Sequence, residues 1–498
     1  MKKLFLLLST ILLLAIESNA TIWNVGATQT YTLPSQIRML VQDGDTIYID
    51  GGIYANDATK WTKKNLIFIG LGVGNNRTIL QYTGDIPNGK GIFVFESPGT
   101  CDNPYLENLV FDGAQVSDAN GANGAGIRYQ ANNITVNNCK FMNCQNGILE
   151  GHGSITTSNV IIINSEFENN GYQIQNDPTY SGYEHNIYIS ASADTMIVTN
   201  CYFHHPRGQA NSLKTRAQRS YILYNLIDEE AAGYGSWEIN IAQGGLTIIM
   251  GNIIIQGAAG ANHGIVGYDA ATNALEDFYF VNNTVINQYV GNIKYFNIAP
   301  AAGINTFKIY NNIFASVVGA NNTMFTGNIP SILDSSNNII AIDYLTLGFT
   351  NPSIQNYSLT AASAAAIDQG TNAGITNTAY SLTPVNMFQS FPSALLPRFI
   401  IGGSIDIGAY EFGLTPGAEE IELQASISVF PNPTNGQFTI SLPTENATII
   451  VLDMLGKQLL KIETTQKLTN LQLDKNGIYF VYIKTSQGAT TRKLIVNR

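Results

Sequence analysis

The sequence predicts an all-β protein in which a long parallel β-helix precedes a small separate β domain. Three observations predict it: a short phrase beginning with Asn recurs through the middle of the chain, β-branched runs precede its copies, and the composition changes after residue 420. Only 12% of the 498 residues are charged and 46 are glycine, a balance that favours strands and turns over helices.

The first twenty residues have the pattern of a signal peptide. Lys2 and Lys3 precede an apolar run from Leu4 to Ile16, and small residues follow up to Ala20. This run is shorter than the roughly 20 residues that a membrane-spanning helix needs, and no later segment reaches that length. We therefore expect an exported chain without a transmembrane anchor.

The repeated phrase consists of Asn, two variable residues and an apolar residue. Its copies lie 24 to 36 residues apart, which suits the rungs of a solenoid with loops of variable length. Two further copies carry Tyr224 and Gly251 in the first position. One rung cannot bury its own apolar side chains, so the rungs must stack. The Asn copies begin at Asn108, Asn138, Asn164, Asn200, Asn282, Asn311 and Asn337.

Two physical reasons explain the repeated Asn. Its amide can bond the same amide on neighbouring rungs and so form a ladder, or it can simply tolerate the left-handed backbone of a turn. Both interpretations give parallel coils. A propeller would need four-strand blades with a longer and more regular period, and a leucine-rich repeat would need helical segments that the sequence does not offer.

Charge and cysteine usage exclude some classes of protein. A net charge of -11 without a Lys/Arg cluster argues against nucleic-acid binding. Four cysteines are no disulfide framework in so long a chain, and their spacing does not suggest zinc. We expect Cys139, Cys144 and Cys201 to pack inside the coil as small apolar side chains, with a disulfide as the alternative; Cys101 is left undecided.

Two phrases mark the ends of the coil. The segment 22–95, with Asp43-Gly-Asp-Thr-Ile47 and Gly51-Gly-Ile-Tyr54, resembles the first coils of secreted right-handed parallel β-helix proteins of the pectate-lyase-like superfamily. The segment 403–412 resembles the phrase with which many bacterial β-helix domains finish. The resemblance implies an N-terminal cap and first coils over 21–100, the right-handed parallel β-helix over 101–412, and a linker over 413–422.

The last 76 residues, 423–498, resemble the type A C-terminal sorting domain of the Bacteroidetes type IX secretion system. The resemblance is carried by Val429-Phe-Pro-Asn-Pro-Thr-Asn-Gly436, by the segments 451–456 and 476–479, and by Arg492-Lys493. It implies a small Ig-like β-sandwich that contacts the secretion machinery and is removed, with the protein released or attached at the cell surface. A carbohydrate-binding sandwich is the alternative.

Aligning the middle strands places candidate side chains on one outer face. Strands alternate, so we set Ile187, Leu213, Ile239 and Ile265 inward and derive three outward columns. Neighbours within one column lie on successive rungs, about 4.8 Å apart. The columns are Tyr188, Lys214, Asn240 and Val266; Ser190, Arg216, Ala242 and Tyr268; and Asn186, Ser212 and Glu238.

The segment from His185 to Asn240 resembles the middle rungs of secreted β-helix proteins and, more distantly, of the β-helix polysaccharide lyases. In those lyases a Lys, Tyr or His removes the proton α to a uronate carboxylate, and Arg or calcium neutralises that carboxylate. The resemblance implies Lys214 as base beside Arg216, and Arg216 would lower the pKa of Lys214. Tyr188 and His185 are further catalytic candidates, and the substrate-binding candidates are Asn186, Glu238, Asn240 and Tyr268.

Several alternatives stay open. Lys214 and Arg216 could pair with Glu238 as a solvated surface cluster. His204 and His205 could be structural, and the acidic run 228–230 could help to hold Ca²⁺. Glycoside hydrolysis needs grouped carboxylates, and Glu238 has no second acid in a matching column. A C5-epimerase shares the first proton abstraction, and a non-catalytic adhesin fits the fold equally well. We expect a monomer that binds an acidic polysaccharide.

Overall fold

The computed structural model describes residues 20–96, 98–151, 158–172, 183–261, 264–269, 273–299, 303–327, 329–413, 427–443, 445–453, 458–475, 477–485 and 488–496. The expected signal peptide lies outside these residues except for Ala20. Within the described part of the chain, no helix is long and apolar enough to cross a membrane.

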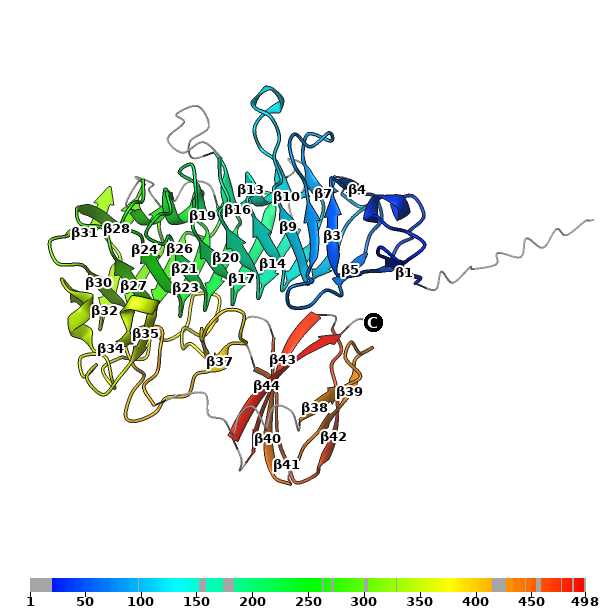
Figure 1. The fold of residues 1–498 in the computed structure, drawn as a ribbon. Coiled ribbons are helices and arrows are strands. Elements are labelled where there is room, and N and C mark those ends of the chain that lie inside the picture. Colours follow the sequence, from blue (N-terminus) through cyan, green and yellow to red (C-terminus); the bar gives the residue numbers. More distant parts are fainter. Residues whose placement is uncertain are drawn as a thin grey trace, which may run out of the picture.

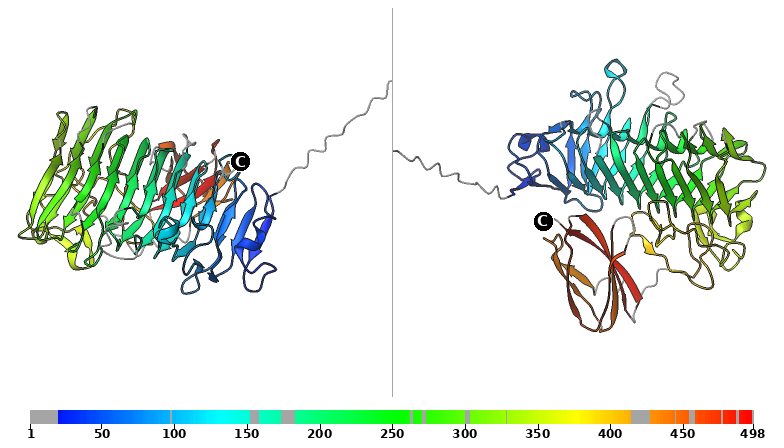
Figure 2. Two further views of the ribbon diagram at one scale, coloured as in Figure 1. Left: turned by 90° about the horizontal axis from the view of Figure 1, so that it is seen from above. Right: turned by 180° about the vertical axis from the view of Figure 1, so that it is seen from behind.

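Three parallel sheets wind into a β-helix, which confirms the expected fold (Figures 1 and 2). Consecutive strands pass from sheet A to sheet B to sheet C, so each turn of the chain adds one strand to each sheet. Sheet A has 12 strands: β1 (Ile22–Val25), β2 (Thr46–Ile49), β5 (Ile67–Gly70), β8 (Tyr105–Glu107), β11 (Ile134–Asn137), β14 (Ser158–Ile163), β17 (Ala193–Thr199), β20 (Arg219–Leu223), β23 (Leu246–Met250), β26 (Asp277–Val281), β29 (Thr306–Tyr310) and β32 (Leu333–Ser336).

Sheets B and C complete the coil, and all neighbouring strands in them are parallel. Sheet B has 11 strands: β3 (Gly52–Ala55), β6 (Thr78–Gln81), β9 (Leu109–Asp112), β12 (Lys140–Met142), β15 (Glu166–Glu168), β18 (Tyr202–His204), β21 (Leu226–Asp228), β24 (Ile253–Gln256), β27 (Thr284–Asn287), β30 (Ile313–Ser316) and β33 (Ile339–Ala341). Sheet C has 10 strands: β4 (Thr59–Trp61), β7 (Gly91–Phe95), β10 (Ala125–Tyr129), β13 (Asn146–Glu150), β16 (His185–Ile189), β19 (Asn211–Thr215), β22 (Trp237–Ile241), β25 (Gly264–Tyr268), β28 (Asn292–Ile298) and β31 (Asn321–Gly327). Two short 3₁₀ helices, η1 (Pro34–Ile37) and η2 (Asp118–Asn120), lie in loops of this coil.

The repeated Asn residues occupy the turn between sheets A and B. All seven have φ between 50° and 58°, so the turn interpretation holds. The amide ladder also exists, and its most regular part lies one residue further along than expected. Asn225, Asn252, Asn283 and Asn312 are buried, and each Nδ2 donates to the Oδ1 on the next rung at 2.9–3.1 Å. The ladder satisfies buried polar groups that would otherwise destabilise the turn.

The repeated apolar position points into the coil. The rings of Phe111, Phe141, Phe167 and Phe203 stack with centroids 5.0, 4.9 and 4.8 Å apart, and all four are fully buried. The four cysteines are buried and make no disulfide, which confirms the expectation for Cys139, Cys144 and Cys201.

The parallel strands end at Ala341, well before residue 412. The hairpins β34 (Phe349–Asn351)–β35 (Asn356–Leu359) and β36 (Asn386–Met387)–β37 (Leu396–Pro397), with η3 (Tyr344–Leu347) and η4 (Pro352–Ile354), follow instead. Residues 360–393 run back along the Asn turns, where Asn311 Nδ2 donates to the carbonyl of Thr371 and Asn200 Nδ2 to that of Ser393. The chain then returns, and Asn282 Nδ2 donates to the carbonyl of Asp406. The first Asn of the repeat therefore also fastens this return segment.

The C-terminal residues form two small antiparallel sheets with a core of their own (Figure 1). One contains β38 (Ser428–Phe430), β39 (Gln437–Ser441) and β42 (Leu468–Gln472). The other contains β41 (Gln458–Thr464), β40 (Ala447–Asp453), β43 (Gly477–Thr485) and β44 (Gly488–Val496).

Candidate functional site

The outer face of sheet C is shaped by a break in strand alternation. In β7, β25 and β28 two successive residues face the core: Ile92 and Phe93, Ile265 and Val266, Tyr295 and Phe296. In a regular strand only one of each pair would do so. The middle strands of sheet C are aligned with these strands, so the same two successive positions face inward there. This alignment decides which side chains reach the surface.

The column Asn186, Ser212 and Glu238, expected outside, lies inside the coil. Asn186 Oδ1 accepts a hydrogen bond from the buried Asn170 at 2.9 Å, and Ser212 Oγ donates to Glu238 Oε2 at 3.2 Å. Burial, with Glu229 and Asp228 nearby, raises the pKa of Glu238 well above its usual value. The expected placement is therefore wrong, and Glu238 does not offer its carboxylate to the outer face.

The expected register is also wrong at the fourth rung. Val266 aligns with Ile239 and faces inward, and Gly267 takes the place beside Asn240. Tyr268 aligns with Ile241, is fully buried and donates to Glu276 at 2.9 Å. The outward place assigned to Tyr268 belongs to Asp269, whose N–H bonds the carbonyl of Ile241.

Tyr188, Lys214 and Arg216 do meet on the outer face, and we call them the cation cluster. Lys214 Nζ lies 5.6 Å and Arg216 Cζ 5.8 Å from the centroid of the Tyr188 ring. Lys214 aligns with Tyr188 on one side and with Asn240 on the other. The ring face attracts both cations and holds them at one spot of the surface.

Neither cation of the cluster is ion-paired within the described residues, although the carboxylate of Asp269 lies near enough for its charge to act on both. Arg216 Nε is buried without a hydrogen-bond partner there. Burial and then the charge of Arg216 lower the pKa of Lys214, which Asp269 partly opposes. The cluster can therefore accept an anionic group and holds a lysine that loses its proton more easily than usual.

His185 lies behind Tyr188. Its ring stacks on that of Tyr188 at 5.8 Å and is 1% exposed. His185 Nδ1 accepts a hydrogen bond from the backbone N–H of Asn211, and Asn211 Oδ1 accepts one from the backbone N–H of Trp237. These bonds connect the first residues of β16, β19 and β22. Burial, then Lys214 and Arg216, lower the pKa of His185 well below its usual value. His185 is thus neutral and braces Tyr188.

Trp237 and Asp269 are surface residues that sequence reasoning did not single out. The ring of Trp237 covers Gly264, where an added Cβ would lie 2.2 Å from it, and Asn240 leans over Gly267 in the same way. The glycine spacing at 264 and 267 could have indicated this, because both glycines of β25 leave room for a larger side chain on β22.

The remaining charged candidates lie on sheet B. His204 contacts Glu166 and Glu230, and His205 contacts Glu230, each at 3.1 Å. Asp228 and Glu229 are fully buried. Glu166, Glu168 and His204 come within 4.8 Å of one another, but Lys140 already pairs with both carboxylates. The acidic run 228–230 therefore makes local contacts and lies away from the cation cluster.

Comparison with known proteins gives a family match for the C-terminal residues and similar solved structures for the chain. The family described as secretion system C-terminal sorting domain matches residues 428–497. The chain is similar to the crystal structure of pectate lyase Pel9A, with 14% identity, a TM-score of 0.44 and coverage of 79% of this chain and 97% of that one. It is also similar to the complex of XylC with xylose, with 10% identity, a TM-score of 0.33 and coverage of 95% and 100%. No curated protein matches the sequence.

The C-terminal match agrees with the separate antiparallel domain, while the β-helix rests on its three parallel sheets. The chain is therefore a parallel β-helix protein that ends in a type IX secretion C-terminal sorting domain and is exported through that system.

Proposed function

We propose that the outer face of sheet C binds a uronate-containing polysaccharide and cleaves it by β-elimination. Lys214 is the base that removes the proton α to the carboxylate, and Arg216 neutralises that carboxylate. The observation that carries the proposal is the cation cluster, in which two cations share one aromatic ring without an ion pair among the described residues.

The chemistry needs both cations. The proton α to a carboxylate is acidic enough to be removed only when the enolate charge is stabilised, and the guanidinium of Arg216 supplies that stabilisation. A lysine base must be neutral when it acts, and burial beside Arg216 favours its neutral form. The electron pair of the broken C–H bond forms the new double bond, the C–O bond to the glycosidic oxygen breaks, and the departing oxygen takes a proton from water.

Hydrolysis is less well supported because it needs two carboxyl groups flanking the glycosidic bond. Glu238 faces the interior, which leaves Asp269 as the acid beside the cluster among the described residues. A C5-epimerase would use the same proton abstraction and return the proton to the other face of the sugar. A non-catalytic adhesin would use the cluster for binding alone.

A product assay separates these functions. The protein without its sorting domain is incubated with polygalacturonate, alginate and glucuronan, with and without added calcium. Elimination gives unsaturated uronates that absorb in the ultraviolet, hydrolysis gives reducing ends without that absorbance, and epimerisation changes the uronate ratio without cleavage. Binding without any product would replace the proposal by the adhesin.

A further inference from the structure

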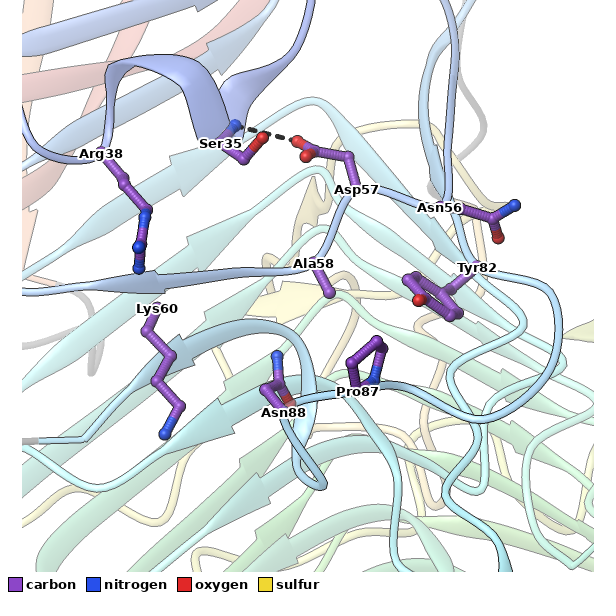
Figure 3. A pocket seen from close by; sticks show the side chains of 9 residues that line it. All are labelled: Ser35, Arg38, Asn56, Asp57, Ala58, Lys60, Tyr82, Pro87 and Asn88. Atoms are coloured by element: carbon purple, nitrogen blue, oxygen red, sulfur yellow. Dashed lines mark hydrogen bonds between the residues drawn. The ribbon is translucent and has the colours of Figure 1, made fainter.

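A cleft lies at the N-terminal end of the coil, where η1, β4 and the loop after β6 meet (Figure 3). Its volume of about 410 Å³ lies in the range of ordinary small-molecule sites. It is lined by Ser35, Arg38, Asn56, Asp57, Ala58, Lys60, Tyr82, Pro87 and Asn88.

The cleft is preformed, because hydrogen bonds hold its walls. Asp57 is buried and accepts the N–H of Ser35 at 2.9 Å, which fixes η1 against β4 (Figure 3). Asn88 Oδ1 accepts the N–H groups of Lys90 and Gly91, which fixes the opposite loop. A preformed site loses little conformational entropy when it binds a ligand.

The charge of the cleft is positive. Arg38 is exposed and forms no ion pair with any described residue. Lys60 and Lys90 share the single carboxylate of Glu96, and hydrogen bonds from Lys60 and then Lys90 lower the pKa of that carboxyl to about 2. Lys60, Lys90 and Arg38 face the two carboxylates of Glu96 and Asp57, so a net positive charge remains in and around the cleft.

The other wall suits a sugar ring. Tyr82 and Pro87 both line the cleft and offer it an aromatic and an apolar surface (Figure 3). Tyr82 is half-buried, packed against the core on one side. Asn56 Oδ1 accepts the N–H of Thr83, the residue after Tyr82, at 2.9 Å, which leaves Nδ2 of Asn56 as a donor. A ring that stacks on Tyr82 would therefore place its acidic group near Arg38 and Lys60.

The cleft lies in line with the cation cluster. Lys60, Val94, Arg128, Leu149, Tyr188 and Lys214 form one column of aligned positions on sheet C. Five rungs separate Lys60 from Lys214, a distance of about 24 Å at the spacing of neighbouring strands. One extended chain could therefore touch both places.

We propose that the N-terminal cleft is a second binding site for an acidic sugar unit of the same polysaccharide, with Tyr82 as stacking platform and Arg38 as anion partner. The proposal rests on the proposed function for the identity of the polymer. A polymer held at both places is retained more strongly than one held at the cation cluster alone, because the second contact becomes intramolecular.

Calorimetry with oligogalacturonide, oligomannuronide and oligoguluronide tetramers and dodecamers tests the proposal. The full exported chain carries Lys214→Ala, so that nothing is cleaved. Arg38→Ala added to it should abolish tetramer binding at the cleft and weaken dodecamer binding by about tenfold or more. Tyr82→Phe keeps the ring and should bind as the parent does. Arg219→Ala, which removes a cation from sheet A that pairs with Asp194, is the matched control.

The proposal is overturned if Arg38→Ala and Tyr82→Ala both bind tetramers and dodecamers with the parent affinity while melting at the parent temperature. This outcome differs from failure of the proposed function, in which the parent forms no unsaturated uronate. In that case a loss of affinity in Arg38→Ala would still establish the cleft as a glycan site.

Discussion

The outer faces of sheets B and C carry similar charged residues and arrange them in opposite ways. On sheet B, Lys140 pairs with Glu166 and Glu168. On sheet C, Lys214 and Arg216 lie over the ring of Tyr188 and form no ion pair among the described residues. The two faces are built on the same coil, so the difference does not come from the fold.

The two faces differ in whether their cations are paired with carboxylates. On sheet B, Lys140 and His204 each contact two carboxylates of the protein, so these groups are paired without a ligand. On sheet C two like charges lie close together, and the nearby carboxylate of Asp269 forms an ion pair with neither among the described residues, so the cluster keeps a net positive charge. Uncompensated charge, rather than charge itself, therefore marks the candidate ligand face.

The largest expected effect separates the two lysines. Lys214→Ala should lower the rate of uronate elimination by about 10² to 10⁴, the usual contribution of a general base. Lys140→Ala on sheet B should leave the rate unchanged, because that lysine only serves its ion pairs. Steady-state rates of unsaturated product formation measure both. Equal losses in the two variants would show that the faces do not differ in function.

Removing the shared core should affect both faces together. Phe167→Ala takes a fully buried ring out of the stack between Phe141 and Phe203 and should destabilise the coil by about 3–5 kcal/mol. Thermal unfolding followed by circular dichroism measures it. Ile340→Ala, whose parent side chain is 65% exposed, is the control and should melt near the parent. An unchanged melting temperature for Phe167→Ala would contradict the stacked core.

The sequence predicts the coil well because its signals are local and repeated. Asn108 and Asn311 mark equivalent turns about two hundred positions apart, and the repeat identifies both. The ladder position was harder to place, since Asn252 and Asn283 follow Gly251 and Asn282 and only packing shows which side chain turns inward.

The candidate face was predicted only in part, for a geometric reason. Tyr188, Lys214 and Arg216 follow from simple alternation and do meet. Glu238 and Tyr268 are misplaced by simple alternation because β22 and β25 each place two successive residues inward, a break that the residue types do not reveal. The outward position of Asp269 follows only from that register.

The two histidines should give opposite pH dependences. Burial opposes protonation of His204, but hydrogen bonds to Glu166 and Glu230 outweigh it and raise its pKa to about 9. The folded state then binds the proton more tightly, so this stabilisation is complete below about pH 6.5 and is lost as the pH rises through about 9. His185 has a lowered pKa, so its contribution is present above about pH 6.5 and is lost as the pH falls.

Single variants isolate these contributions from the other titrating groups. Chemical unfolding of the parent, His204→Gln and His185→Gln is measured from pH 5 to 10. The difference between parent and His204→Gln should shrink on the alkaline side, and the difference between parent and His185→Gln on the acidic side. A His204 difference that stays constant up to pH 10 would mean that the sheet B network does not hold a charged imidazole.

The smallest expected effect concerns the ring between the two cations. Tyr188→Phe keeps the ring face that attracts Lys214 and Arg216. The whole cation–π contact contributes about 0.5–1 kcal/mol at an exposed site, so a variant that retains it should change kcat/KM less than about fivefold. Tyr188→Ala removes the ring and should raise KM more than it lowers kcat, because Lys214 and Arg216 keep their charges but lose their common position. If Tyr188→Phe instead loses about 10² or more in rate, the hydroxyl is the proton-transferring group and Lys214 is the residue that supports it.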